Sequence, residues 1–265
     1  MKFERRFVEK PWGRTELPKV FGGTGGRRIG EIWFTGGGDL PLLVKYIFTS
    51  ERLSIQVHPS HEQAQAQARG LTSGKEECWY ILDAEPGATL GLGLNREVAP
   101  DVLREAAVDG SIEELMDWRP VKAGDFFYVP AGTIHAIGGG LSLLEFQQNA
   151  DVTYRLYDYG RPRELHLDDG IAVARPQLYS DHHARHVSPG EPTILVRGPL
   201  FSLVQALNGE VRTSIANHRR WVMPLDREVH AGSEAAGPGE CLLVEAGEDL
   251  EFDTGRVLIG VEGSL

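Results

Sequence analysis

Three segments of the sequence carry side chains of the kinds that bind metal ions in proteins. Gln56 and His58 flank Val57 in an alternating stretch, so both side chains project from the same face of a strand. Glu77 lies 19 residues after His58 at the start of an apolar stretch, and His135 follows a Pro-Ala-Gly bend. Together they offer two imidazoles, one carboxylate and one amide, a ligand set that suits a zinc site with an open position.

Each of these segments also fits a purely structural role when it is taken alone. A Gln-x-His pair is more often an ordinary polar strand face, and the charged run from Lys75 to Glu77 would then be a solvated turn. His135 would cap a hairpin turn. The combination of all three segments is what favours a metal site.

The segment 144–161 carries many polar side chains although apolar, core-like stretches flank it. Such a density of polar groups predicts a lined cavity more than a solvated edge. An acidic residue of this segment could transfer protons. Arg155 or Arg161 could hold an anionic group, because a guanidinium presents a bidentate fork to phosphate oxygens.

Short alternating apolar stretches predict the strands that position these residues. They occupy 42–48, 53–57, 78–82 and 126–128, and turn residues lie near each of them. The 32 glycines and 15 prolines are scattered at short intervals, which suits many strands joined by tight turns. We therefore predict an all-β chain with short helical insertions.

Two segments interrupt the alternation and are predicted to be helical. Ser60 with Gln63 forms a capping signal for a short helix that Gly70 would close. A second insertion covers about 97–118, where a helix over 100–108 precedes a capping box that opens at Ser111.

A change of composition near 180–192 predicts a domain boundary. Residues 180–186 are polar, and Pro189, Gly190 and Pro192 follow them as breakers. We expect a catalytic domain over 1–180 and a smaller β domain over 190–265. The second domain keeps a glycine bend at 237–247 but no histidine after it, so it should lack a metal site.

Composition excludes several classes of partner. The net charge is −11 and no run of lysine or arginine could follow a phosphate backbone, so nucleic acids and anionic membranes are disfavoured. No stretch approaches the roughly 20 apolar residues of a membrane span, and the first residues lack a signal peptide pattern, so the cytoplasm is the expected location. Cys78 and Cys241 are the only cysteines, which excludes an all-thiolate zinc site. The sequence does not indicate an oligomeric state.

Residues 124–135 resemble the second cupin motif, with Gly138 where many cupins carry asparagine. Together, four segments closely resemble class I mannose-6-phosphate isomerases, the zinc-dependent cupin type, in their short bacterial form. The matching stretches are LSIQVHP at 53–59, GK at 74–75 with ECWYI at 77–81, VPAGTIHA at 129–136, and QQN at 147–149 with Asp151, TYR at 153–155 and YD at 157–158. KPWG at 10–13 and GEIW at 30–33 echo the amino-terminal signature of the family. The resemblance covers about residues 7–170.

The resemblance implies a cupin barrel, which is a jelly roll or double-stranded β-helix, followed by a smaller and degenerate cupin-like β-sandwich. It also implies one zinc ion per chain, and the family's four ligands fall on Gln56, His58, Glu77 and His135. Glu76 stands where the family usually has threonine, and strand alternation favours Glu77 over Glu76 as the ligand.

The same resemblance assigns the remaining site residues. The acid/base carboxylate falls on Glu145, and the family's other active-site positions fall on Arg155, Lys75 and Asp151. Ser54 and Arg161 occupy places associated with the phosphate end of the sugar, and Arg163, two residues further, could replace Arg161.

The expected activity is the reversible isomerisation of mannose 6-phosphate and fructose 6-phosphate, with proton transfer through an enediol. A small sugar phosphate is thus the expected partner. Two alternatives share the fold: a sugar-binding cupin without catalysis, and an isomerase of a different, unphosphorylated sugar. A third is another metal-cupin enzyme such as a dioxygenase, which would need a redox-active iron that zinc cannot replace.

Overall fold

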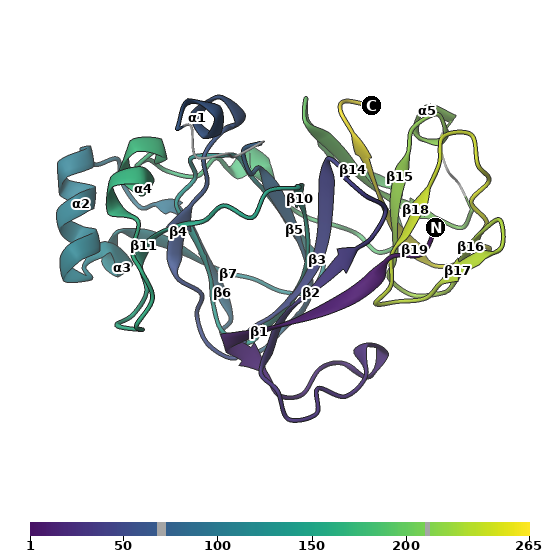
Figure 1. The fold of residues 1–265 in the computed structure, drawn as a ribbon, viewed down its shortest axis with the longest axis horizontal. Helices are drawn as coiled ribbons and strands as arrows, with labels where there is room; N and C mark the ends of the chain where they lie inside the picture. Colours follow the sequence, from purple (N-terminus) through teal and green to yellow (C-terminus); the bar gives the residue numbers. More distant parts are fainter. Residues whose placement is uncertain (68–72, 210–212) are drawn as a thin grey trace.

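The computed structural model describes residues 1–67, 73–209 and 213–265, which fold mainly into antiparallel β-sheets (Figure 1). The largest sheet has seven strands in the order β1-β2-β3-β10-β5-β8-β12. Its strands are β1 (Glu4–Arg14), β2 (Ile29–Thr35), β3 (Leu42–Phe48), β10 (Leu141–Gln148), β5 (Glu77–Ala84), β8 (Asp125–Val129) and β12 (Ala184–His186). Every pairing in it is antiparallel.

A second sheet faces the first and completes the barrel. Its order is β11-β4-β9-β6-β7, with β11 (Tyr154–Tyr157), β4 (Ile55–Val57), β9 (His135–Ile137), β6 (Thr89–Leu94) and β7 (Met116–Pro120). Apolar side chains from both sheets, among them Trp79, Ile81, Leu92 and Ile137, pack together in the barrel interior. The polar site described below lies in the same interior, and Ile137 also lines its cavity.

Three helices cover the outer face of the second sheet: α2 (Pro100–Asp109), α3 (Ile112–Leu115) and α4 (Leu167–Val173). A further helix, α1 (His61–Ala66), follows β4. Leu103 and Ile112 pack with Ile55 and Val57 in one buried cluster, so α2 and α3 shield the sheet that carries part of the site. Figure 1 shows these two helices and α4 stacked beside β4 and β11. Two 3₁₀ turns, Lys19–Phe21 and Asp181–His183, complete the helical segments of this part of the chain.

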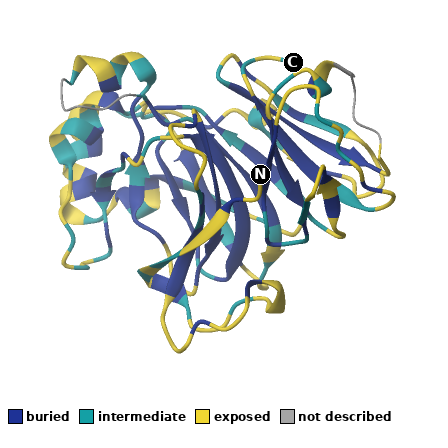
Figure 2. Ribbon diagram, turned by 45° about the vertical axis from the view of Figure 1, so that its right-hand side comes forward, coloured by how far each residue is buried: buried dark blue, intermediate teal, exposed yellow. Residues whose placement is uncertain are grey.

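The last third of the chain forms a separate five-stranded sheet in the order β13-β14-β19-β15-β18. Its strands are β13 (Thr193–Arg197), β14 (Phe201–Leu207), β19 (Arg256–Glu262), β15 (Arg220–Pro224) and β18 (Leu242–Val244). A hairpin of β16 (Val229–Ala231) and β17 (Glu234–Ala236) and the short helix α5 (Thr213–Ala216) flank it. Figure 2 shows that both groups of strands are largely buried, whereas exposed residues lie in loops and on helices.

Strand β10 connects the site to this carboxy-terminal sheet because its side chains alternate between two faces. Leu144 and Phe146 pack with Phe201 and Trp221 in the core between the large sheet and the carboxy-terminal sheet. Glu145 and Gln147 project from the opposite face of the strand, into the barrel. All residues of β10 are buried.

The structure confirms the predicted all-β chain and the predicted helix after Ser60, whose side chain and that of Gln63 form the expected capping box. Gly70, the residue expected to close this helix, lies outside the described residues. The capping box expected at Ser111 is wrong: Ser111 has a helical backbone and its side chain makes no capping hydrogen bond. Residues 184–186, expected in a polar boundary segment, instead form β12 against β8. Among the described residues, no helix is long and apolar enough to cross a membrane.

Candidate metal centre and active site

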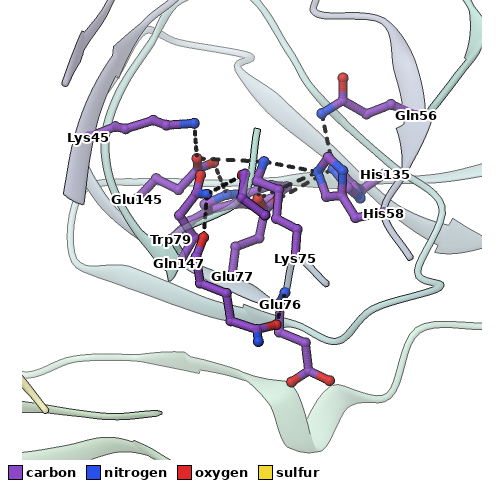
Figure 3. Close-up of polar contacts among 12 residues, drawn as sticks. Lys45, Gln56, His58, Lys75, Glu76, Glu77, Trp79, His135, Glu145 and Gln147 are labelled. Atoms are coloured by element: carbon purple, nitrogen blue, oxygen red, sulfur yellow. Dashed lines mark hydrogen bonds and ion pairs between the residues drawn. The ribbon is translucent and has the colours of Figure 1, made fainter. Parts of the chain in front are cut away.

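His58, Glu77 and His135 meet inside the barrel with ligand atoms that all lie within 4.8 Å of one another. His58 follows β4, Glu77 begins β5 and His135 begins β9, so strands of both sheets contribute. The Glu77 carboxylate bridges the two imidazoles: Oε2 lies 3.5 Å from His58 Nε2, and Oε1 lies 3.4 Å from His135 Nε2. Figure 3 shows the three side chains converging, whereas Glu76 points away from them. Tyr128 donates a hydrogen bond to Glu76, which explains that direction.

Gln56 lies beside this cluster because it is directly opposite His135 in the β4–β9 pairing. Its Nε2 lies 3.2 Å from His135 Nε2, and its Oε1 accepts a hydrogen bond of 3.0 Å from Ser54 Oγ. Ser54 therefore orients the Gln56 carboxamide at the edge of the cluster.

The donor atoms of the cluster fit a divalent cation. Both oxygens of Glu77 are buried and make no hydrogen bond with the described residues, a costly state that a bound cation at the carboxylate would relieve. Burial, and then the Lys75 ammonium, lowers the pKa of His58 to about 3, and burial also lowers the pKa of His135. Both imidazoles are therefore neutral, as metal binding requires.

Lys75 gives the cluster a fixed positive neighbour. Its Nζ lies 2.7 Å from Glu77 Oε2, as an ion pair without hydrogen-bond alignment, and 3.1 Å from His58 Nε2. Burial alone would raise the pKa of Glu77, but Lys75 and the two histidines hold it well below its usual range. Glu77 is therefore a carboxylate. The Glu145 carboxylate, and then Glu77, raise the pKa of Lys75 although burial opposes this.

Glu145 is the carboxyl group best suited to proton transfer. It is 3% exposed, Trp79 Nε1 donates to its Oε2 over 3.0 Å, and Lys45 Nζ lies 3.4 Å from its Oε1 (Figure 3). Burial, and then the Glu77 carboxylate, raises the pKa of Glu145 against the opposing effect of Lys75 and Lys45. A raised pKa brings a carboxyl group closer to the range in which a general base is effective.

A cavity of about 270 Å³ opens beside these groups. It is lined by Lys10, Trp12, Glu31, Lys45, Ile47, Leu53, Ser54, Gln56, Lys75, Ile137, Glu145, Asp151, Thr153, Arg155, Arg163 and His166. Most of these side chains are polar, as the sequence predicted for the segment after 144. A larger cavity of about 650 Å³ lies between the large sheet and the carboxy-terminal sheet, but its lining includes none of the predicted site residues.

The structure brings most of the predicted residues to one place. Six of them line the cavity: Ser54, Gln56, Lys75, Glu145, Asp151 and Arg155. Arg161 does not line it; its guanidinium pairs with Asp158 and Glu51 and donates to the Arg52 carbonyl over 2.7 Å. Arg163, the alternative two residues further, lines the cavity instead.

Several polar residues of the cavity have no predicted role. Lys10, Glu31 and Lys45 form one network: Lys10 Nζ lies 3.2 Å from Glu31 Oε2, and Lys45 lies over the Trp33 ring at 4.3 Å. Trp33 Nε1 donates to Glu31 over 2.7 Å. Lys10 and Glu31 belong to the motifs at 10–13 and 30–33. Only the family resemblance pointed to these motifs, and it gave neither residue a role.

His166 is another such residue, and it is fixed to Arg155 from two sides. The His166 amide donates to the Arg155 carbonyl over 2.8 Å, and the Arg155 amide donates to His166 Nδ1 over 3.3 Å. Because Nδ1 accepts this bond, a neutral His166 ring carries its proton on Nε2.

No family model matches the sequence. ManA of Bacillus subtilis (strain 168), a mannose-6-phosphate isomerase, is 44% identical over 156 residues, which cover 57% of this chain and 49% of ManA. The mannose-6-phosphate isomerase of Streptococcus mutans is 39% identical over 65% of this chain and 56% of its own length. The chain thus spans about half the length of these two relatives. GmuF of Bacillus subtilis, described as a probable mannose-6-phosphate isomerase, is 35% identical over 241 residues, which cover 74% of this chain and 76% of GmuF.

Solved structures extend the similarity to nearly the whole chain. The mannose 6-phosphate isomerase of Bacillus subtilis superposes with a TM-score of 0.76 at 25% identity and covers 98% of both chains. A zinc-bound mannose 6-phosphate isomerase superposes with a TM-score of 0.72 at 13% identity over 99% of both chains. These superpositions confirm the predicted cupin fold. With GmuF matched over three quarters of its length, the chain belongs to the mannose-6-phosphate isomerase family.

Proposed function

We propose that this protein interconverts mannose 6-phosphate and fructose 6-phosphate, and that it does so with one zinc ion per chain. The observation that carries the proposal is the content of one cavity. Glu145, a buried carboxyl group of raised pKa, lines this cavity together with the guanidinium groups of Arg155 and Arg163. The cluster of two neutral imidazoles and one carboxylate lies beside the cavity. Family membership and the zinc-bound relative support the same activity.

The reaction moves one proton between two neighbouring carbons of the open-chain sugar. Glu145 takes the proton from C2 of the aldose and returns it to C1, while the hydroxyl proton at O2 is lost and O1 gains one. The C1 aldehyde thereby becomes an alcohol and C2 becomes the ketone, without an external oxidant. General acid/base help of this kind is typically worth about 10² to 10⁴ in rate.

The residues His58, Glu77, His135 and Gln56 would hold the zinc ion. When bound, zinc supplies a Lewis acid that favours negative charge on the sugar oxygens. Lys75 and Lys45 add fixed positive charge on the Glu145 side of the cavity. Because these charges are already in place before the reaction, they stabilise the enediol without reorganisation of solvent.

The cavity also suits a phosphate group. Arg155 and Arg163 both line it, and burial and the Arg163 charge lower the pKa of Arg155. Two guanidinium groups held this close are stabilised by a dianion between them. Asp151 and Thr153 also line the cavity and can orient sugar hydroxyl groups.

The decisive experiment is a coupled assay of mannose 6-phosphate conversion on protein of measured metal content. Activity should disappear when a chelator removes the metal and return when zinc is restored. Unphosphorylated mannose is the matched comparison and should react far more slowly. Absence of turnover with zinc bound would contradict the proposal, and binding of the sugar phosphate without turnover would identify a non-catalytic sugar-binding cupin. The cytoplasmic location stays a prediction from the sequence.

A further inference from the structure

Asp158 is a carboxylate that the proposed reaction does not use, yet it is among the most completely buried charged groups of the chain. Its side chain is 1% exposed. Arg163 donates to it through Nε and Nη2, both over 2.6 Å, and Arg161 Nη1 donates over 3.1 Å. A bidentate pair of this kind fixes both the position and the plane of the Arg163 guanidinium.

A tight turn brings these three residues together. The Arg161 amide donates to the Asp158 carbonyl over 3.0 Å, and the two central residues, Tyr159 and Gly160, have φ values of 54° and 74°. Positive φ at both positions defines a turn of type I′. A tyrosine in this conformation is strained, and the contacts of its ring with Tyr157 and the Arg161 guanidinium help to hold it there.

The two arginines that donate to Asp158 have different surroundings. Arg161 turns to the surface, where it binds Glu51 and the Arg52 carbonyl. Arg163 lines the cavity, and its Nη1 has no partner among the described residues. Arg155 also lines the cavity, and its Nη1 donates to the Glu164 carbonyl. Its Nε and Nη2 donate to none of the described residues. Donor groups of both arginines therefore remain available for an anion.

We propose that Asp158 is a positioning residue that presents Arg163 to the phosphate group of the substrate. The inference rests on the proposed function and assigns the phosphate end to Arg163 and Arg155, with Arg161 as a structural anchor of the turn. Asp158 does not touch the substrate. It acts by keeping Arg163 preorganised, so that no side-chain freedom of this arginine is lost when phosphate binds.

The test is a mutant cycle of Asp158→Asn, Arg163→Ala and the double variant. The KM for mannose 6-phosphate is measured together with kcat, and the Kd of inorganic phosphate is measured by calorimetry on the zinc-loaded protein. Asp158→Asn should raise both KM and the phosphate Kd by about 10- to 100-fold, the range for one lost charge-assisted hydrogen bond, with little change in kcat. The double variant should be no worse than Arg163→Ala alone, because Asp158 acts through Arg163.

Asp226→Asn is the matched control. Asp226 accepts a bidentate pair from Arg256 in the carboxy-terminal part, with distances of 2.8 and 2.7 Å, and neither residue lines the 270 Å³ cavity. Its loss should leave KM and the phosphate Kd unchanged. If Asp158→Asn does not fold, Asp158→Glu keeps the charge and displaces the carboxylate, and it should raise the same two constants.

Different failures of this experiment have different meanings. An Asp158→Asn variant that binds phosphate as the wild type does would overturn the positioning role, as would additive effects in the double variant. A wild-type protein that binds phosphate without isomerising mannose 6-phosphate would remove the proposed function but leave the assignment of Asp158 intact.

Discussion

Glu145 has a tryptophan and two lysines as its polar neighbours, so its carboxyl group is held in a single orientation. Changing it to glutamine keeps the shape and the Trp79 hydrogen bond but removes the proton acceptor. We expect kcat to fall by about 10² to 10⁴. The zinc content should stay unchanged, since Glu145 is not part of the metal cluster. Metal analysis and the coupled assay on the same sample check both points, and near-normal turnover would exclude Glu145 as the base.

A substitution of His135, in contrast to one of Glu145, should change the zinc content. Replacement of His135 by alanine removes one imidazole of the cluster and leaves the Glu77 carboxylate with fewer partners. We expect metal content and activity to be lost together, because the remaining ligands bind zinc more weakly. The control is His186→Ala, since His186 is half exposed and pairs with Asp125 outside the cavity. Full zinc occupancy of the His135 variant would reject this ligand assignment.

Residue spacing was sufficient to predict the metal cluster but not the whole cavity. Alternation puts Gln56 and His58 on one face, and in the structure both side chains lie beside His135. Lys10, Glu31 and Lys45 come from β1, β2 and β3, and only the order of these strands in the sheet brings them to the cavity. The choice between Arg161 and Arg163 depends on a turn with a tyrosine at positive φ, which no residue type at that position indicates.

At the level of elements, helix α1 begins only three residues after His58, so its capping box also anchors the end of the metal-binding segment. Ser60 Oγ accepts from the Gln63 amide over 3.3 Å, and Gln63 Oε1 accepts from the Ser60 amide over 2.9 Å. Ser60→Ala should lower the free energy of unfolding by about 1 kcal/mol. Urea denaturation measures this loss.

Ser111→Ala is the matched control for this prediction. The Ser111 side chain makes no capping hydrogen bond although the residue precedes a helix. Its replacement should change the free energy of unfolding by less than about 0.5 kcal/mol. Equal effects of the two substitutions would show that the capping box of α1 contributes nothing specific.

The predicted strands follow from alternating apolar residues, and strand β12, which the sequence analysis did not predict, lacks such a signal. Strand β12 has three residues, of which Arg185 and His186 are exposed, so it carries no apolar periodicity. Its existence depends on pairing with β8. At Ser111 the expected capping motif is present, but α2 ends at Asp109 with Gly110 as its C-cap, and Ser111 has a helical backbone that is unsuited to capping.

At the scale of the whole molecule, a single glycine permits close packing of the carboxy-terminal sheet on the large sheet. A Cβ at Gly260 would lie 2.2 Å from the nearest ring atom of Phe146. Gly260→Ala should therefore lower the free energy of unfolding by about 1 to 3 kcal/mol, because neither sheet can yield easily. Gly190→Ala, where a Cβ would meet nothing within 4 Å, should have little effect in the same denaturation experiment.

The proposed division into domains over 1–180 and 190–265 stays a prediction. The apolar core between the sheets includes residues from both ranges, among them Tyr46, Leu144, Phe201 and Leu258. The amino terminus adds to this contact, since the Phe3 amide donates to the Cys241 carbonyl over 3.0 Å. Composition near 180–192 could indicate a boundary but could not indicate how much apolar surface is shared across it.

The position of β10 also determines how the protein should lose activity. This strand is paired on both edges, with β3 and β5, and all its residues are buried, so its amide hydrogens should exchange with solvent only when the whole molecule unfolds. Glu145 sits on that strand, and no local opening can displace it. On heating, catalysis and tertiary structure should therefore disappear over the same temperature interval, without an inactive but folded intermediate.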